Sequence, residues 1–347
     1  MADKIRVIVD AFGGDNAPLE VIKGAIRAVN ELDVDITLVG NEEKIRNCAK
    51  ENELDISGLA IHHAPTVMAV ETEPTKILKE YSDSSMAVGL KLLHDGEGDA
   101  FVSGGSTGAL TVGATFIVKR MKGIKRCAIG MVLPTTKEPC MVLDIGANSE
   151  CRPEMLTQFA IMGSAYMNKL QGVENPRTAL INIGTEPTKG RDLETETYKQ
   201  LGNAPVNFIG NIEAREIPLG GADVAVTDGF SGNLVLKTYE GMGKLISAYL
   251  KDIFSGVTGK IAGLFVLKRI NAMKKKLDYA EYGGAPLLGA AKPVIKAHGS
   301  SNATAFYNAI RQAKLYIENH VTKEIATALE EMKAKEAEEK NGYIRRI

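Results

Sequence analysis

Short β-branched runs alternate with longer segments of helical period along most of this chain, and few folds accommodate that order of elements. Nine runs are expected to be strands: Ile5–Val9, Ile36–Val39, Ile61–His63, Ala100–Ser103, Ala128–Leu133, Met141–Ile145, Thr178–Ile183, Val206–Ile209 and Val224–Thr227. The helical segments between them are Leu19–Leu32, Glu42–Asn52, Met86–Leu93, Glu154–Leu170 and Leu193–Leu201. Several runs are apolar throughout, as in strands that helices cover on both faces. The pattern predicts an α/β fold with a mainly parallel sheet flanked by helices.

Six turns rich in small residues lead into expected helices, five of them directly from a strand end. They are residues 9–18, 103–109, 144–149, 182–190, 227–233 and 298–302. Two of them belong to a weak internal repeat, because Asp99–Gly108 aligns without gaps on Asp223–Gly232. Parallel sheets bind ligands at the carboxyl ends of their strands, so equivalent turns are expected to meet in one cleft. Chance similarity of small-residue turns is the alternative.

The turn 103–109, Ser-Gly-Gly-Ser-Thr-Gly-Ala, carries the strongest local signal. It lacks bulky side chains and opens an expected helix, so its amides and hydroxyls are suited to hold a tetrahedral oxyanion. The first turn adds Gly13-Gly14, whose backbone freedom lets the chain approach an anion closely. The residues that we predict to bind phosphate are Gly104, Gly105, Ser106, Thr107, Gly108, Asp10, Gly13, Gly14, Asp228 and Ser231.

Four further residues in these turns are the candidate catalytic groups: Lys189, Asn148, Asn233 and His298. Lys189 offers a point charge to phosphate. His298 offers a proton donor or an anion contact, and Asn148 both donates and accepts hydrogen bonds. A solvated loop lysine and a capping or packed histidine are the ordinary alternatives.

Sequence motifs bear on two other enzyme classes, the serine hydrolases and the dinucleotide-binding enzymes. Gly104–Gly108 matches G-x-S-x-G with Ser106 in the nucleophile position, followed by Asp228 and His298, so a serine hydrolase stays open. The chain has no G-x-G-x-x-G, which weakens a dinucleotide-binding hypothesis. The four cysteines lack zinc-site spacing and no nucleic-acid-binding motif occurs, so we expect neither a metal nor a nucleic-acid partner.

Length and charge are those of a cytoplasmic globular enzyme. The 347 residues carry a net charge of −1, so no global field draws the chain to nucleic acid or membrane. The N-terminus leads into a strand without a signal peptide, and no apolar run reaches the ~20 residues that span a bilayer. We expect one α/β domain over residues 1–347.

The segment 243–277 differs from the rest of the chain. It holds eight basic residues against the single acid Asp252, a local charge of 8 − 1 = +7. Its apolar residues fall near helical spacing, which predicts an amphipathic basic helical insertion. We expect Ile261, Leu264 and Phe265 to contact an anionic membrane surface. A helical hairpin that packs only against a dimer mate is the alternative. The Lys- and Glu-rich tail after Lys323 is expected to be a solvated helix.

Taken together, the turns resemble the bacterial phosphate acyltransferases of phospholipid synthesis, which use acyl carrier protein (acyl-ACP) as donor. The resemblance rests on Val9–Pro18, Ser103–Ala109, Leu143–Asn148, Asn182–Glu186 with Lys189-Gly190, Asp228–Asn233 and Ala297–Ser301. These motifs run in order over nearly the whole chain. The one small departure is Phe12, where this family is expected to have Met.

The resemblance implies a catalytic domain similar to isocitrate/isopropylmalate dehydrogenases and phosphotransacetylases, with a protruding amphipathic helical segment. It implies transfer of a long-chain fatty acyl group from acyl-ACP to inorganic phosphate, without a cofactor. It also implies a homodimer at the inner face of the cell membrane, and a downstream glycerol-3-phosphate acyltransferase that uses the acyl phosphate for phosphatidic acid. The alternative is a phosphotransacetylase-like enzyme that uses a small acyl-CoA.

The implied reaction divides the candidate residues by role. The amides of residues 105–108 and the Lys189 charge would orient phosphate, and Asn148, Asn233 or His298 would stabilise the thioester oxyanion. A basic cluster is then a candidate dock for the acidic carrier, with a solvated turn as the alternative: Lys119, Arg120, Lys122, Lys125 and Arg126.

Overall fold

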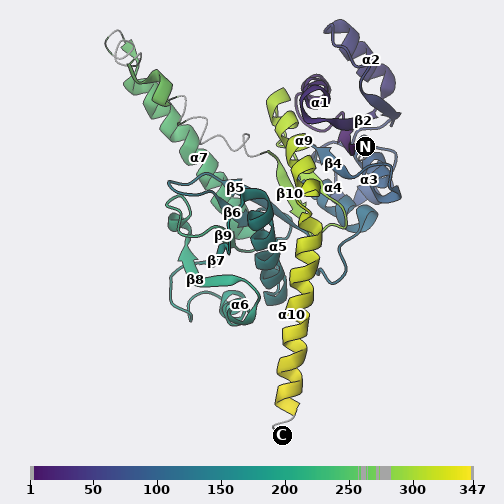
Figure 1. Ribbon diagram of the computed structural model, residues 1–347. Coiled ribbons are helices and arrows are strands. Elements are labelled where there is room, and N and C mark those ends of the chain that lie inside the picture. The colour runs from purple at the N-terminus through teal and green to yellow at the C-terminus, as the bar shows by residue number, and fades with distance from the viewer. Residues whose placement is uncertain are drawn as a thin grey trace.

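The computed structural model describes residues 4–256, 258, 263, 265–270, 273 and 283–344. One eleven-stranded sheet organises them, in the order β3-β2-β1-β4-β11-β10-β5-β6-β9-β7-β8 (Figure 1). The strands are β1 Ile5–Asp10, β2 Val34–Gly40, β3 Ala60–His63, β4 Ala100–Ser103, β5 Ala128–Leu133, β6 Cys140–Leu143, β7 Arg177–Asn182, β8 Asn207–Glu213, β9 Val224–Val226, β10 Ala285–Leu288 and β11 Val294–Lys296.

The sheet consists of two parallel halves that run in opposite directions. Strands β3, β2, β1, β4 and β11 are mutually parallel, and so are β6, β9, β7 and β8. Three antiparallel pairings join the halves, β11 with β10, β10 with β5, and β5 with β6. The mainly parallel α/β sheet predicted from the sequence is confirmed, and the antiparallel centre is an addition to it.

Helices cover both faces of the sheet. They are α1 Leu19–Leu32, α2 Glu42–Glu51, α3 Ser85–Asp95, α4 Thr107–Gly113, α5 Pro153–Gln171, α6 Asp192–Asn203, α7 Gly229–Ile253, α9 Ala303–Glu318 and α10 Val321–Ile344, with short turns at Pro74–Leu78, Ala114–Val118 and Ala214–Glu216. Figure 1 shows α7 and α10 extending from the body in opposite directions. No helix within the described ranges is long and apolar enough to cross a bilayer.

Side-chain alternation along the strands assigns residues to the two faces. In β1, Val7 and Val9 pack with α1 and α9, while Ile8 points to the opposite face and packs with α3. The same alternation in β11 separates Val294 from Ile295. Lys296, the last residue of β11, therefore lies on the face of Val294.

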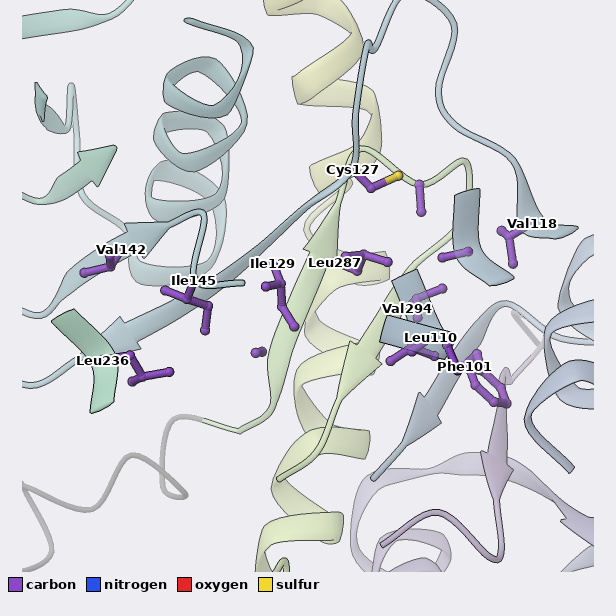
Figure 2. Close-up of a cluster of buried hydrophobic side chains, with 14 of the residues drawn as sticks. Phe101, Leu110, Val118, Cys127, Ile129, Val142, Ile145, Leu236, Leu287 and Val294 are labelled. Carbon is purple, nitrogen blue, oxygen red and sulfur yellow. The ribbon is translucent and has the colours of Figure 1, made fainter. Parts of the chain in front are cut away.

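One buried cluster crosses the centre of the sheet and ties the two halves together. Figure 2 shows five of its members, Phe101, Leu110, Ile129, Ile145 and Leu236, which come from β4, α4, β5, the turn after β6, and α7. Because these buried side chains come from both halves of the sheet, their packing holds the two halves together.

The internal repeat has a matching local structure. Asp99 accepts hydrogen bonds from the backbone and guanidinium of Arg6, which lies on the neighbouring β1. Asp223 does the same with Arg177 on the neighbouring β7. Each pair anchors the entry to a strand, β4 or β9, whose exit turn opens a helix.

Two expectations for the C-terminal part are corrected. Strands β10 and β11 were not predicted, because both are short and Gly and Pro residues interrupt the region. The tail after Lys323 is helical as predicted, but it is not solvated all round. Ile325 and Leu329 of α10 are buried in the cluster that also contains the α5 side chains.

Candidate active site

A cavity of about 340 Å³ lies where the two halves of the sheet meet. Its walls come from the turns after β4, β11 and β6, from β5, and from the first turns of α7. The residues that carry polar groups into it are Asp15, Ser106, Thr107, Asn233, Lys237, Glu240, Lys296, His298 and Ser301. Ile129, Met131, Ile145 and Leu236 form its apolar part.

The turn after β4 is held in a fixed conformation by contacts behind it. The Ser103 hydroxyl donates to a carboxylate oxygen of Asp10 over 2.7 Å, and the Gly105 amide donates to the Ser103 hydroxyl over 3.0 Å. A β-carbon on Gly104 would lie 2.6 Å from the carbonyl oxygen of Gly13. Only glycine allows this approach of two backbone segments.

The Gly105 amide is therefore already paired, although Gly105 lines the cavity, and the phosphate contact predicted for it stays a prediction. The next three amides, those of Ser106, Thr107 and Gly108, have no acceptor within the described residues. Ser106 and Thr107 line the cavity, while Gly108 faces Pro74. The turn thus offers amide donors at a helix N-terminus, where an anion is favoured.

Asp10, Gly13 and Gly14 lie behind the turn, outside the lining of the cavity. Burial raises the pKa of Asp10 above its ordinary value, while hydrogen bonds from Ser85, Ser103 and Phe12 oppose that shift. Asp10 supports the turn through the Ser103 hydroxyl. These three residues do not line the cavity, and the phosphate-binding role predicted for them stays a prediction.

Lys296 is a buried cation of the cavity, and no sequence pattern predicted it. Its side chain is only 9% exposed. The ammonium donates to the carbonyl of Gly104 over 3.1 Å and to the carbonyl of Ala297. Burial lowers the pKa of Lys296 to about 8, and the charges of Asp10 and Asp15 limit that shift. The ammonium is thus fixed against the turn that carries the unpaired amides.

His298 and Ser301 complete the polar wall. His298 Nδ1 lies 2.8 Å from the Ser300 hydroxyl and accepts a hydrogen bond from the Ser300 amide over 3.2 Å. Burial and the Lys296 charge lower the pKa of His298, so the ring is neutral at pH 7 with its proton assigned to Nε2. The Ser301 hydroxyl is buried and has no hydrogen-bond partner within the described part of the chain. An unsatisfied buried hydroxyl on a cavity wall is a position for a ligand atom.

The other predicted residues of the turns after β6, β7 and β9 do not line the cavity, although Gly146 after β6 and Asn233 of α7 do. Asp228 caps α7 through the Ser231 amide and forms an ion pair with Arg191 at 2.6 Å. Asn148 donates to the Cys127 carbonyl and to Asp144, both over 2.8 Å. Lys189 lies on an exposed loop away from the cavity lining.

The predicted convergence of all six turns is therefore corrected to two groups. Gly104–Thr107, His298 and Asn233 meet in the cavity, while Asn148, Asp228, Ser231 and Lys189 do not line it. The geometry also fails to support a serine hydrolase. The Ser106 hydroxyl accepts from the Ala109 amide as a helix cap, and His298 Nδ1 lies against the Ser300 hydroxyl.

Comparison with known proteins extends these observations. The model of a family described as fatty acid synthesis protein matches residues 5–324. A phosphate acyltransferase of Thermoanaerobacterium thermosaccharolyticum is 44% identical over 92% of this chain and 97% of its own length. A phosphate acyltransferase of Oceanobacillus iheyensis is 45% identical over 94% of this chain and 98% of its own length.

Solved structures support the fold at low sequence identity. A phosphotransacetylase from Streptococcus pyogenes superposes with a TM-score of 0.62 at 18% identity, covering 93% of this chain and 95% of that one. A 4-hydroxythreonine-4-phosphate dehydrogenase from Klebsiella pneumoniae gives 0.52 at 13% identity, covering 92% and 99%. The family match over most of the chain, with relatives aligned over nearly their full length, shows that this chain belongs to the fatty acid synthesis protein family.

Proposed function

We propose that this enzyme transfers a long-chain acyl group from the thioester of acyl-ACP to inorganic phosphate. The products are an acyl phosphate and free carrier thiol, and the acyl phosphate serves phosphatidic acid and phospholipid synthesis through a glycerol-3-phosphate acyltransferase. Membership of the family and the two phosphate acyltransferases at 44% and 45% identity support acyl transfer to phosphate. No metal or organic cofactor is part of the proposal, and neither is a nucleic-acid partner.

One observation carries the proposal at the level of the site. The buried Lys296 ammonium, the unpartnered Ser301 hydroxyl and the amides of Ser106 and Thr107 belong to one cavity. Together they supply a positive charge and several donors. Asp15 and Glu240 line the same cavity, but neither forms an ion pair with Lys296 among the described residues. That combination suits a multiply charged oxyanion.

The chemistry needs no protein nucleophile, because phosphate supplies it. A phosphate oxygen attacks the thioester carbonyl carbon, a C–O bond forms, the C–S bond breaks, and the carrier thiolate takes a proton from solvent. Lys296 and the amides hold phosphate in line, which removes the entropic cost of a bimolecular encounter. Neutral His298 and Asn233, which both line the cavity, donate to the oxyanion that develops on the carbonyl in this proposal.

The apolar half of the cavity fits an acyl donor. Met131, Ile145 and Leu236 line the cavity together with exposed Val70. A small acyl-CoA would not need this surface. The phosphotransacetylase-like alternative is kept as the second candidate because a phosphotransacetylase shares the fold.

We extend the proposal to a homodimer at the inner membrane face, with residues 243–277 as the contact segment of a single catalytic domain. Exposed apolar side chains run along α7, namely Phe230, Leu234, Met242, Leu245, Ile246, Tyr249 and Ile253. Phe265 is 85% exposed, whereas Ile261 and Leu264 lie outside the described residues. An exposed apolar face on a helix that also carries Lys244 and Lys251 suits both a partner helix and an anionic surface.

The reaction is tested with palmitoyl-ACP and radiolabelled phosphate. We expect label in a lipid-soluble product, released in step with free thiol and dependent on enzyme. Turnover with acetyl-CoA but not with palmitoyl-ACP would favour the phosphotransacetylase-like alternative. Thiol release without incorporation of label would indicate hydrolysis and contradict the proposal.

Membrane contact is tested separately by flotation with vesicles rich in anionic lipid. The wild-type enzyme is expected to float, and a Leu264→Glu, Phe265→Glu variant is expected to stay in the load fraction. Flotation of the variant to the wild-type extent would reject contact through these residues. Sedimentation equilibrium of both proteins reports whether the dimer survives the change.

A further inference from the structure

A strongly basic surface lies outside the cavity and takes no part in the mechanism above. Five of the eight residues 119–126 are basic and none is acidic, namely Lys119, Arg120, Lys122, Lys125 and Arg126. We call these five residues the basic edge. The ammonium of Lys333 from α10 adds to it, 2.5 Å from where a β-carbon on Gly123 would stand.

The backbone of the basic edge is fixed to the body of the protein. The Lys119 carbonyl accepts from the Ala291 amide over 2.8 Å, and the Met121 amide donates to the Gly289 carbonyl over 2.9 Å. Buried Gln158 of α5 holds the other end. Its side chain donates to the Gly123 carbonyl and accepts from the Lys125 amide. A rigid backbone with projecting charges binds at a lower entropic cost than a mobile loop.

The charges of the basic edge are not neutralised by the protein itself. In the chain as far as it is described, no carboxylate forms an ion pair with any of the five side chains. Many other basic residues on the surface are paired, for example Lys169 with Glu324 and Arg46 with Glu42. Unpaired cations that lie close together repel one another, so an anionic partner gains attraction and relieves that repulsion.

The basic edge is connected to the cavity through the turn after β6. Arg126 and Arg152 line a second hollow of about 440 Å³ together with Ala147, Asn148 and one acidic residue, Glu150. The preceding residue, Gly146, lines the active-site cavity. The two hollows thus lie on either side of one turn. Gly146 has no side chain, so we take it as the entry point to the cavity for a group bound at the arginines.

We propose that the basic edge, with Arg152, is the docking surface for the acyl carrier, an acidic protein whose acyl group is attached through a phosphopantetheine arm. This inference rests on the proposed function and adds the location of the donor. Carboxylates of the carrier pair with Lys119, Lys122 and Lys125. The phosphodiester of the arm meets Arg126 and Arg152, as guanidinium groups favour phosphate. The thioester then reaches the cavity past Gly146.

The test compares two donors on one enzyme. Palmitoyl-ACP needs the docking surface, while palmitoyl-pantetheine has neither the carrier nor the phosphodiester and needs only the cavity. The test variant is Lys122→Glu, Lys125→Glu, Arg126→Glu, which leaves the Arg120 hydrogen bond to the Lys125 carbonyl in place. The matched control is Lys44→Glu, Lys50→Glu, Lys199→Glu, three exposed lysines on α2 and α6 with the same change in net charge.

We expect the test variant to raise KM for palmitoyl-ACP at least about tenfold, the effect of ~1.4 kcal/mol in binding. Its kinetics with palmitoyl-pantetheine and phosphate should equal those of the wild type, which also shows that it is folded. The control variant should keep the wild-type KM for both donors. Higher ionic strength should raise the wild-type KM for palmitoyl-ACP and leave palmitoyl-pantetheine unaffected.

Three outcomes would overturn the inference. The test variant could keep the wild-type KM for palmitoyl-ACP, or it could lose activity with both donors alike. It could also lose only its flotation with anionic vesicles, which would assign the basic edge to the membrane. The proposed function itself fails differently, since wild-type enzyme would then form no acyl phosphate from either donor.

Discussion

The ammonium of Lys296 lies 3.1 Å from the carbonyl oxygen of Gly104, and this contact fixes the cation of the cavity against the turn that carries its unpaired amides. The two residues are far apart in the sequence, but β11 and β4 are parallel neighbours whose last residues, Lys296 and Ser103, pair in register. The pairing of β11 with β4 therefore assembles the anion site.

Replacing Lys296 with Met should lower kcat/KM at least about 100-fold, a loss of ~2.7 kcal/mol in transition-state stabilisation. The reason is the loss of the buried charge that holds phosphate. Steady-state assays with palmitoyl-pantetheine measure this without involving the carrier. Lys189→Ala is the comparison, and it should change kcat/KM less than about twofold because its exposed loop does not line the cavity. Equal losses in the two variants would contradict the assignment.

Activity should fall as the pH rises through about 8. The pKa of Lys296 is lowered to about 8, so the ammonium is present below that pH and is lost above it. An arginine keeps its charge, so in an active Lys296→Arg variant the alkaline limb of the pH profile should move to higher pH. The profile of kcat/KM for phosphate reports this titration. An alkaline limb that stays unchanged in the arginine variant would assign the titration to another group.

Gly104→Ala should destabilise the protein, because its β-carbon would lie 2.6 Å from the Gly13 carbonyl oxygen and backbone must move. We expect a loss of about 1–3 kcal/mol in the free energy of unfolding. Gly202→Ala in α6 is the matched control, since nothing lies within 4 Å of its β-carbon position, and alanine favours helix by about 0.5–1 kcal/mol. Urea unfolding of both variants gives the comparison. A Gly104→Ala protein as stable as the wild type would show that the two backbone segments can separate freely.

Ser103→Ala should weaken phosphate binding without touching the ligand. The hydroxyl joins Asp10 to the Gly105 amide, and its removal frees the turn that presents the next amides. We expect KM for phosphate to rise several-fold, while Ser103→Thr, which keeps the hydroxyl, should recover part of the loss. A purely structural role would lower Tm in the alanine variant and leave KM for phosphate as it is.

The sequence predicts the α/β class, most strands, and the turn after β4 that lines the cavity. It does not reveal that β6, β7 and β9 run against β1 and β4, so Asn148, Lys189 and Asp228 were expected in a shared pocket. A signal was present, since only residues 134–139 separate β5 from β6, too short for a parallel crossover of about a dozen residues. Lys296 was missed because a lysine that ends a three-residue strand has no local pattern. Its burial depends on β4, which is distant in the sequence.

The central claim is that the cavity binds phosphate as the nucleophile, and the phosphate dependence of thiol release tests it most directly. Free thiol from palmitoyl-ACP should appear at a rate that saturates with phosphate concentration in the wild type and approaches zero without phosphate. In Lys296→Met that saturation should need a much higher phosphate concentration or disappear. Thiol release at the same rate with and without phosphate would contradict the account.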